Sequence, residues 1–111
     1  DGFALAMDVS THSFVRLAKK AEPLLEKAGG GSLVTMTYLG SEKVIPNYGV
    51  MGLCKAALEA ATRYMAAELG AKGIRVTPED IGALTAFLVS DAGRLVTGGV
   101  HFVDAGYNIM A

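Results

Sequence analysis

The stretch "SLVTMTYLGSEKVIPNYGVMGLCK" (residues 32–55) contains a strand, a loop and the start of a helix in succession. Residues 32–38 have the apolar and β-branched content of a buried strand. Gly40 and Pro46 punctuate the loop that follows, and residues 48–70 form the longest helical pattern of the chain. A buried strand that leads into a long helix predicts one unit of a layered α/β fold.

The flanking segments continue this alternation of helix and strand. Residues 13–28 place their apolar side chains on one stripe at helical spacing, with Ser10 or Thr11 as the candidate N-cap. Residues 73–76, "GIRV", have strand character, and residues 98–106, "GGVHFVDAG", read as a closing strand. The order of elements predicts a parallel sheet covered by helices.

A further helix is predicted over residues 77–91. Thr77 is its expected N-cap, and Pro78 is its expected first helical residue. Three parallel strands leave both faces and both edges of a sheet in need of cover. We therefore expect the chain to be part of a larger fold.

The composition excludes several classes of protein. The 111 residues carry a formal net charge of −1, so no basic surface is expected to hold nucleic acid or anionic lipid. A single cysteine, Cys54, rules out an intrachain disulfide and suits a reducing cytoplasm. His12 and His101 lie far apart in the sequence without ligand spacing, so no metal site is expected. No apolar run approaches the roughly 20 residues of a membrane span.

Three residues of this stretch suggest chemistry. Tyr38 ends the predicted strand, and ligands of open parallel sheets bind beyond the carboxyl ends of strands. Tyr48 and Lys55 are seven residues apart, so they share a helix face, and a lysine ammonium near a phenol lowers its pKa. A tyrosine so placed can donate a hydrogen bond to an oxygen that becomes negative during a reaction. Tyrosine near a helix start and lysine within a long helix are also common without any function.

The sequence resembles a known enzyme family. Residues 36–76, "MTYLGSEKVIPNYGVMGLCKAALEAATRYMAAELGAKGIRV", are similar to the NADH-dependent bacterial enoyl-[acyl-carrier-protein] reductases of the short-chain dehydrogenase/reductase superfamily. Most of that superfamily uses a Tyr-x-x-x-Lys pair, whereas the enoyl reductases use Tyr-x6-Lys with another tyrosine ten positions upstream. This chain has the second arrangement. "DVSTHSFVRLAKKAEPLL" and "GGVHFVDAGYNIM" also fit the family, so the resemblance extends over nearly all of the chain.

The resemblance implies a Rossmann-type, doubly wound parallel sheet and a role for each matching residue. Tyr48 matches the residue that hydrogen-bonds the thioester carbonyl oxygen, and Lys55 matches the ligand of the nicotinamide ribose. Tyr38 matches the second active-site tyrosine. Met51 is expected to line the acyl pocket, and Met36 and Thr37 are expected to pass close to the nicotinamide end of the cofactor.

The same resemblance implies a reaction and partners. The reaction is hydride transfer from NADH to a trans-2-enoyl thioester, the last reductive step of fatty-acid elongation, with acyl carrier protein as the carrier of the substrate. A homotetramer is implied, in which the alanine-rich helix over residues 57–69 packs against a copy of itself. A cytoplasmic location is expected.

The chain departs from the family pattern in two places. No strand with a glycine-rich turn for the pyrophosphate is found, because "AGGGSLV" precedes a strand instead of following one. Val76 also runs directly into Thr77, where the family has a cofactor-contacting loop and a substrate-covering helix. We therefore expect residues 1–111 to be a partial reductase domain that lacks the N-terminal dinucleotide-binding half, with a false junction at Val76–Thr77.

Two other interpretations remain open from the sequence. The chain is either the enzyme fragment described above or a non-catalytic oligomerising fragment that cannot bind a dinucleotide. A short-chain ketoreductase is a further alternative, but Gly52 stands where a Tyr-x-x-x-Lys pair needs lysine.

Overall fold

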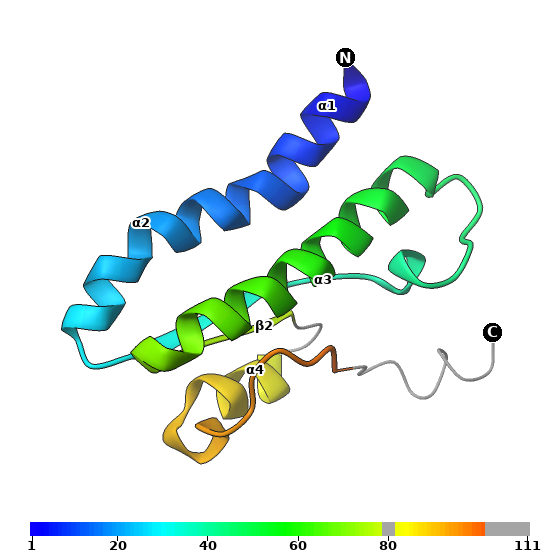
Figure 1. The fold of residues 1–111 in the computed structure, drawn as a ribbon. Helices are drawn as coiled ribbons and strands as arrows, with labels where there is room; N and C mark the ends of the chain where they lie inside the picture. Colours follow the sequence, from blue (N-terminus) through cyan, green and yellow to red (C-terminus); the bar gives the residue numbers. More distant parts are fainter. Residues whose placement is uncertain (79–81, 102–111) are drawn as a thin grey trace.

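The computed structural model describes residues 1–78 and 82–101 of the chain. Two parallel strands and the helices packed on them form the described fold (Figure 1). In chain order the elements are α1 (Gly2–Met7), the π-helical turn η1 (Asp8–His12), α2 (Ser13–Lys27), β1 (Gly31–Thr35), the 3₁₀ turn η2 (Leu39–Ser41), α3 (Gly49–Leu69), the 3₁₀ turn η3 (Gly70–Lys72), β2 (Ile74–Pro78), α4 (Gly82–Val89) and the 3₁₀ turn η4 (Asp91–Gly93).

α2 starts at Ser13 as predicted, but neither Ser10 nor Thr11 caps it, because α1 and η1 run into α2 without a break and form one continuous helical rod. The rod begins at Asp1, whose side chain accepts a hydrogen bond of 2.8 Å from the backbone N–H of Ala4. Thr11, a predicted cap, lies in η1 and is buried, and its hydroxyl donates to the carbonyl oxygen of Cys54 at 2.9 Å. A polar residue at this position resembles a helix cap in the sequence, but its partner lies on another helix.

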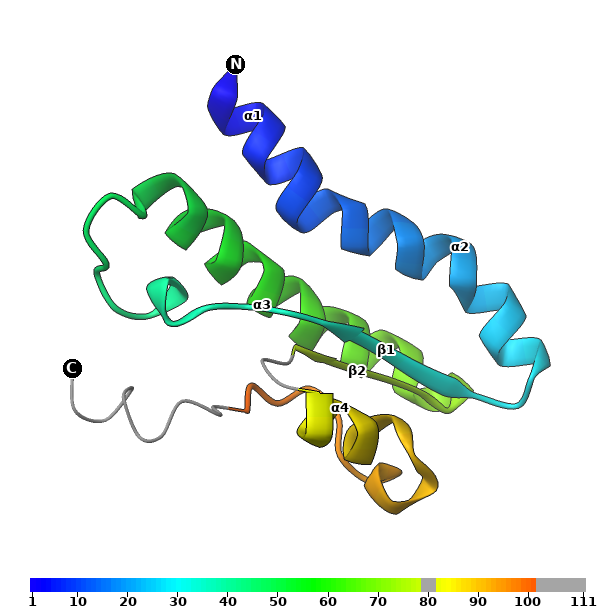
Figure 2. The same ribbon diagram turned by 180° about the vertical axis from the view of Figure 1, so that it is seen from behind.

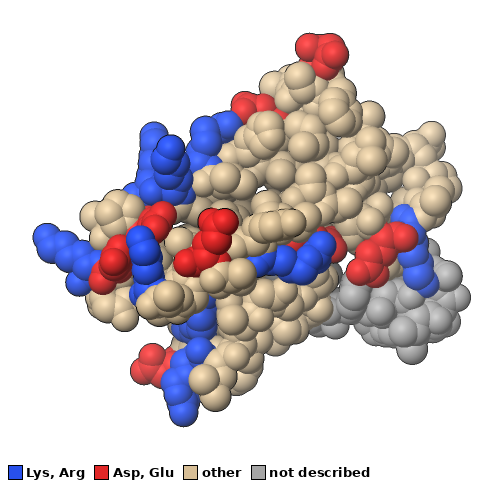
Figure 3. Space-filling view, viewed as in Figure 1, with Lys and Arg blue, Asp and Glu red and all other residues tan. Residues whose placement is uncertain are grey.

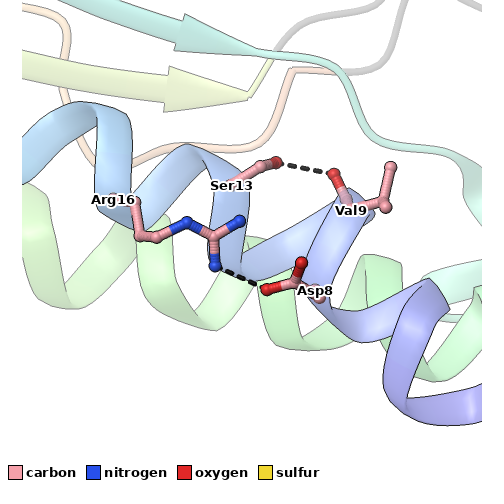
Figure 4. Close-up of polar contacts among 4 residues, drawn as sticks. All are labelled: Asp8, Val9, Ser13 and Arg16. Carbon is pink, nitrogen blue, oxygen red and sulfur yellow. Dashed lines mark hydrogen bonds and ion pairs between the residues drawn. The ribbon is translucent and has the colours of Figure 1, made fainter.

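Polar side chains on the outer side of the rod bridge its π-helical turn (Figure 4). The hydroxyl of Ser13 donates to the carbonyl oxygen of Val9 at 2.6 Å, and Arg16 forms an ion pair of 2.5 Å with Asp8. A π-helical turn widens the helix and leaves carbonyl groups without their usual i→i−4 partners. The Ser13 hydroxyl adds a side-chain partner to one carbonyl group of this turn.

The sheet confirms the predicted α/β class. β1 and β2 pair in parallel, in a register that runs from Gly31 opposite Ile74 to Thr35 opposite Pro78. Figures 1 and 2 show α2 and α3 on one side of the strands and α4 on the other. Helices on both sides of a parallel sheet are the arrangement of a doubly wound fold.

The core lies between the sheet and the α2–α3 layer. Each large apolar side chain buried there contributes roughly 1.5–3 kcal/mol relative to exposure to water. Outside this core, at the surface, Lys72 of η3 forms ion pairs with Glu22 (2.6 Å) and Glu26 (3.1 Å) of α2. The buried cluster consists of Phe14, Ala18, Leu33, Leu58, Ala66, Leu69, Ile74 and Val76.

The predicted elements after residue 76 are only partly correct. Thr77 and Pro78 end β2 instead of starting a helix, and α4 begins at Gly82. Thr77 is β-branched and pairs with Val34, and Pro78 ends the strand, where its missing N–H breaks no further ladder bond. Of the strand predicted over residues 98–106, residues 98–101 are not in a strand and the rest lies outside the described residues.

The segment before residue 101 nevertheless runs beside β2. The backbone N–H of Gly98 donates to the carbonyl oxygen of Val76 at 3.1 Å, and the N–H of Val76 donates to the Thr97 hydroxyl at 3.3 Å.

None of the helices in the described ranges combines the length and the apolarity that a bilayer crossing requires.

Candidate functional site

The candidate site begins where β1 ends. β1 stops at Thr35, so Tyr38 lies three residues beyond the strand and not at its last position. Met36 and Tyr38 are exposed to 60% and 46%, respectively, and Tyr38 has an extended backbone with φ −147° and ψ 153°. The segment Met36–Tyr38 therefore extends past the carboxyl end of the sheet, where ligands of such folds bind.

The two tyrosines predicted for the site lie against each other. Tyr48 is the N-cap residue of α3, and its ring contacts that of Tyr38 edge-on, with centroids 5.1 Å apart and an interplanar angle of 67°. The loop 39–47 thus folds back so that residues ten apart in the sequence become neighbours. The structure brings Tyr38 and Tyr48 together, while their chemical roles remain predictions.

Lys55 lies at the same edge of the sheet but does not act on Tyr48 as predicted. Its Nζ donates a hydrogen bond of 3.1 Å to the carbonyl oxygen of Met36. The pKa of Tyr48 is raised above its ordinary value, first by burial and then by the neighbouring Tyr38 and Cys54 groups. The predicted lowering of this pKa is therefore wrong, because burial disfavours the phenolate and Lys55 is not among the groups that shift it.

Thr37 has a buried partner that the sequence analysis missed. Its hydroxyl donates to a carboxylate oxygen of Glu59 at 2.5 Å, and Glu59 is only 5% exposed. Glu59 stands one helical turn after Lys55, so both side chains leave α3 on the same face. This spacing was visible in the sequence, but the burial of the carboxylate was not.

Two glycines make room for the Tyr48 ring. A Cβ on Gly40 would overlap that ring, and a Cβ on Gly52 would lie 2.7 Å from the carbonyl oxygen of Gly40. Their missing side chains let η2 pack closely on the start of α3. In the sequence, Gly52 indicates only the absence of a Tyr-x-x-x-Lys pair, and its place beside the Tyr48 ring is visible only in the fold.

A cavity of about 290 Å³ opens beside the site. Tyr48 is the predicted site residue that lines it, whereas Tyr38, Met51 and Lys55 do not. Met51 is half-buried on the first turn of α3. Tyr48 therefore borders both the cavity and the Tyr38 ring. Its lining residues are Gly40, Ser41, Glu42, Lys43, Val44, Ile45, Tyr48, Gly49, Gly52, Leu53 and Ala56.

Cys54 and His12, the other residues considered as candidates, have the surroundings of structural residues. Cys54 is fully buried, as predicted for a small apolar side chain. His12 is exposed in η1. Among residues 1–78 and 82–101, no group of three or more His, Cys, Asp or Glu side chains is arranged to hold a metal ion.

Sequence comparisons give the chain its relatives. The family described as "Enoyl-(Acyl carrier protein) reductase" matches residues 1–77 and 75–108. The NADH enoyl-[acyl-carrier-protein] reductase 2 of Rhizobium meliloti is 39% identical over 145 positions, which cover 98% of this chain and 53% of the relative. The chain thus spans about half the length of the curated relatives that it matches.

Solved structures agree with this assignment. An enoyl-[acyl-carrier-protein] reductase of Anaplasma phagocytophilum, solved in complex with NAD, superposes with a TM-score of 0.91 at 38% identity and covers 96% of this chain and 52% of that one. The NADH enzyme of Aquifex aeolicus gives the same TM-score at 41% identity, with 98% and 52% covered. With its Tyr38–Tyr48 pair and Lys55 at the carboxyl end of a parallel strand, the chain belongs to the enoyl-[acyl-carrier-protein] reductase family.

Proposed function

We propose that this chain carries the reacting end of an NADH-dependent enoyl-[acyl-carrier-protein] reductase. The observation that supports this most directly is Tyr48, a tyrosine with a raised pKa that lies against Tyr38 at the carboxyl end of the sheet. A tyrosine with a raised pKa stays protonated near neutral pH and can donate a hydrogen bond. The relatives named above as NADH enoyl-[acyl-carrier-protein] reductases support the same reaction.

In the proposed reaction Tyr48 acts on the substrate carbonyl. Its hydroxyl donates a hydrogen bond to the thioester carbonyl oxygen of a trans-2-enoyl group. Hydride arriving at the β-carbon breaks the carbon–carbon double bond and places negative charge on that oxygen, and a proton then reaches the α-carbon to give the saturated thioester. A donor already aimed at the oxygen stabilises this charge without reorganisation during the step.

The residues at the end of β1 fit the nicotinamide end of NADH, which supplies the hydride when bound. The Lys55 ammonium has three N–H donors, and one of them is used by the Met36 carbonyl. The remaining donors suit ribose hydroxyls. Met36 and Thr37, on the segment that Lys55 holds, are the proposed neighbours of the nicotinamide.

Tyr38 and Met51 are proposed to contact the acyl chain. Tyr38 is half-exposed beside Tyr48, and Met51 follows Tyr48 by three residues on α3. An aromatic ring and a flexible thioether provide an apolar surface that adapts to an acyl group. Acyl carrier protein is the proposed carrier of this group, and the cytoplasm is the proposed location.

The assembly is proposed to be a homotetramer built on α3. Val50 and Leu53 of this helix are 47% and 60% exposed, and small side chains follow over residues 57–69. Figure 3 shows that charged side chains gather over α2, whereas the surface around α1 and the start of α3 is mostly uncharged. Small and apolar exposed side chains allow two such helices to approach closely.

The test is NADH oxidation by the purified protein in the presence of an enoyl thioester. We expect Tyr48→Phe to lower kcat by about a hundredfold or more, because the transition-state donor is removed. Tyr64→Phe is the matched control, since Tyr64 lies on the same helix and is 73% exposed. Activity that survives in Tyr48→Phe would overturn the proposed role of Tyr48.

The same protein distinguishes the alternative functions. Tetramer formation without any NADH binding would favour the oligomerising fragment over the enzyme. A ketoreductase would reduce a 3-oxoacyl thioester instead of an enoyl thioester, and Gly52 at the position for its lysine disfavours it.

A further inference from the structure

The segment that follows β1 is attached to α3 at two successive points. Lys55 Nζ donates to the Met36 carbonyl oxygen at 3.1 Å, and the Thr37 hydroxyl donates to Glu59 at 2.5 Å. Lys55 and Glu59 are four residues apart, so they form consecutive rungs on one face of α3. The next residue along the segment is Tyr38.

The second attachment is buried. Glu59 is 5% exposed, and none of the three ion pairs found among the described residues includes it. A buried carboxyl group is costly unless it is hydrogen-bonded, so its position depends on the Thr37 hydroxyl. Leu58 and Thr62 beside it are almost fully buried, which leaves the Glu59 side chain little freedom to move.

The free end of the segment carries the candidate site. Tyr38 is half-exposed, and its described ring contact is Tyr48, at 5.1 Å between centroids. No strand partner restrains the segment before Tyr38, because β1 already stops at Thr35. Tyr38 is therefore held on one side by the Thr37–Glu59 bond and on the other by Leu39, which is 7% exposed in η2.

We propose that Glu59 is a positioning residue of this site: through Thr37 it fixes the segment Met36–Tyr38, and thereby the Tyr38 ring against Tyr48 and the Met36 carbonyl against Lys55. The proposal rests on the proposed function, because it assigns Glu59 to the same reaction. Glu59 contacts neither substrate nor cofactor in this role.

The experiment compares four variants that change the bond in different ways. Glu59→Leu and Thr37→Val remove the acceptor and the donor while keeping the volume, and Glu59→Gln and Thr37→Ser keep the bonding group. Glu26→Leu is the matched control, because Glu26 is an exposed helical glutamate on α2, outside the stretch of α3 proposed for the tetramer. The readouts are kcat and KM for the enoyl thioester and for NADH, together with Tm.

We expect Glu59→Leu and Thr37→Val each to lower kcat/KM by about tenfold, and the double variant to be no worse than either, because both remove one interaction. Glu59→Gln and Thr37→Ser should recover most of this loss, and Glu26→Leu should match the parent protein. Losses that multiply in the double variant, or unchanged kinetics in Thr37→Val, would overturn the proposal. Thr37→Val, a change of similar volume at a half-buried position, decides the question if Glu59→Leu does not fold.

A crystal structure of the Thr37→Val variant separates this proposal from the proposed function. A Tyr38–Tyr48 centroid separation well beyond 5.1 Å supports the positioning role, and an unchanged pair of rings overturns it. This result does not depend on activity. If the parent protein oxidises no NADH with an enoyl thioester, the proposed function fails, while the ring separation still decides the role of Glu59.

Discussion

At the scale of single residues, the surroundings of Tyr48 determine what its hydroxyl can do. Burial, Tyr38 and Cys54 all raise the pKa of the phenol, in that order of importance. An ionised phenol could only accept hydrogen bonds, whereas a phenol of ordinary pKa is already a donor at neutral pH, so the raised pKa extends this donor ability to higher pH. Tyr38 is thus proposed to serve the site through its effect on Tyr48 as well as by contact with substrate.

The raised pKa gives a pH dependence of stability with a defined sign. Because the folded-state pKa of Tyr48 exceeds the ordinary value of 10.0, its contribution to the free energy of unfolding is complete below pH 10.0 and is lost as the pH rises through the folded-state pKa. Between pH 10.0 and the folded-state pKa of Tyr48, we expect the free energy of unfolding to fall more steeply with pH in the parent protein than in Tyr48→Phe. Urea denaturation at several alkaline pH values measures this difference, and parallel curves would contradict it.

Gly40 offers a second test at this scale. The added methyl group of Gly40→Ala would overlap the Tyr48 ring and displace it. We expect kcat/KM for the enoyl thioester to fall by about tenfold or more, since small displacements of a reacting group are costly. Gly70→Ala is the control, because a Cβ there meets nothing within 4 Å. Equal activity of the two variants would show that the close approach of Gly40 is not needed.

At the scale of elements, Thr11 links the N-terminal rod to α3 at the residue before Lys55. Thr11→Val removes the buried bond to the Cys54 carbonyl, and we expect the free energy of unfolding to fall by about 1–2 kcal/mol. Ser13→Ala removes an exposed bond to Val9 and should cost less than about 0.5 kcal/mol. Denaturant titration measures both values, and a larger effect of Ser13→Ala would refute this ranking.

Arg75 of β2 caps the carboxyl end of α4. Its guanidinium donates to the carbonyl oxygens of Leu88 at 2.6 Å and of Val89 and Ser90 at 3.3 Å. Cations at this end of a helix bond the free carbonyl groups and oppose the helix dipole. The contact explains how a short helix stays docked on a two-stranded sheet.

Arg75→Met should therefore loosen α4 more than the other helices. We expect faster amide hydrogen exchange in α4 than in α3, and a loss of about 1–3 kcal/mol in the free energy of unfolding. Arg94→Met is the control, because Arg94 is exposed and makes one long contact of 3.5 Å with Asp91. Unchanged exchange in α4 would mean that apolar packing alone holds it.

The sequence predicted those elements whose pattern is local. Residues 48–70 gave α3 nearly to its ends, and residues 32–38 located β1, which stops at Thr35, because β-branched runs and helical spacing are local signals. The cap predicted at Thr11 and the helix start predicted at Thr77 were wrong, because tertiary contacts use both cap-like side chains differently. Periodicity carries no information about a partner 43 residues away, such as Cys54 for Thr11.

The spacing of residues in the sequence located the candidate site, whereas the burial and the contacts of its side chains were not predicted. The Tyr-x6-Lys spacing identified Tyr48 and Lys55, and the structure brings both to the end of β1. The direction of the Tyr48 pKa shift depends on burial and on where the Lys55 side chain points, which spacing does not give. Glu59 was missed for the same reason, since an acid on a long helix is usually exposed.

At the scale of the whole molecule, the alignments with relatives are longer than this chain. The alignment with the Rhizobium meliloti enzyme spans 145 positions, which exceeds the 111 residues present here. The family matches the chain as two pieces that meet at residues 75–77. Both facts support the prediction that Val76 and Thr77 are not neighbours in the natural protein.

Tryptic digestion tests this junction. Cleavage after Arg75 and Arg94 would release residues 76–94 as one peptide if Val76 is joined to Thr77. We expect this peptide to be absent from digests of the natural protein, and the intact mass to correspond to roughly 250 residues, the scale of a complete dinucleotide-binding domain. Detection of the peptide would contradict the predicted junction.

The π-helical turn η1 has a consequence for the rotational phase of the long N-terminal rod. One extra residue in a helix shifts the angular position of everything upstream by about 100°. Residues of α1 therefore point in directions that the α-helical numbering of α2 does not predict. Phe3 precedes Phe14 by about three α-helical turns, yet Phe3 is 48% exposed whereas Phe14 is buried. Deleting one residue within Asp8–His12 would restore a single phase and turn the apolar side chains of α1 by that angle, so this rod should be more sensitive to a one-residue deletion than to most substitutions.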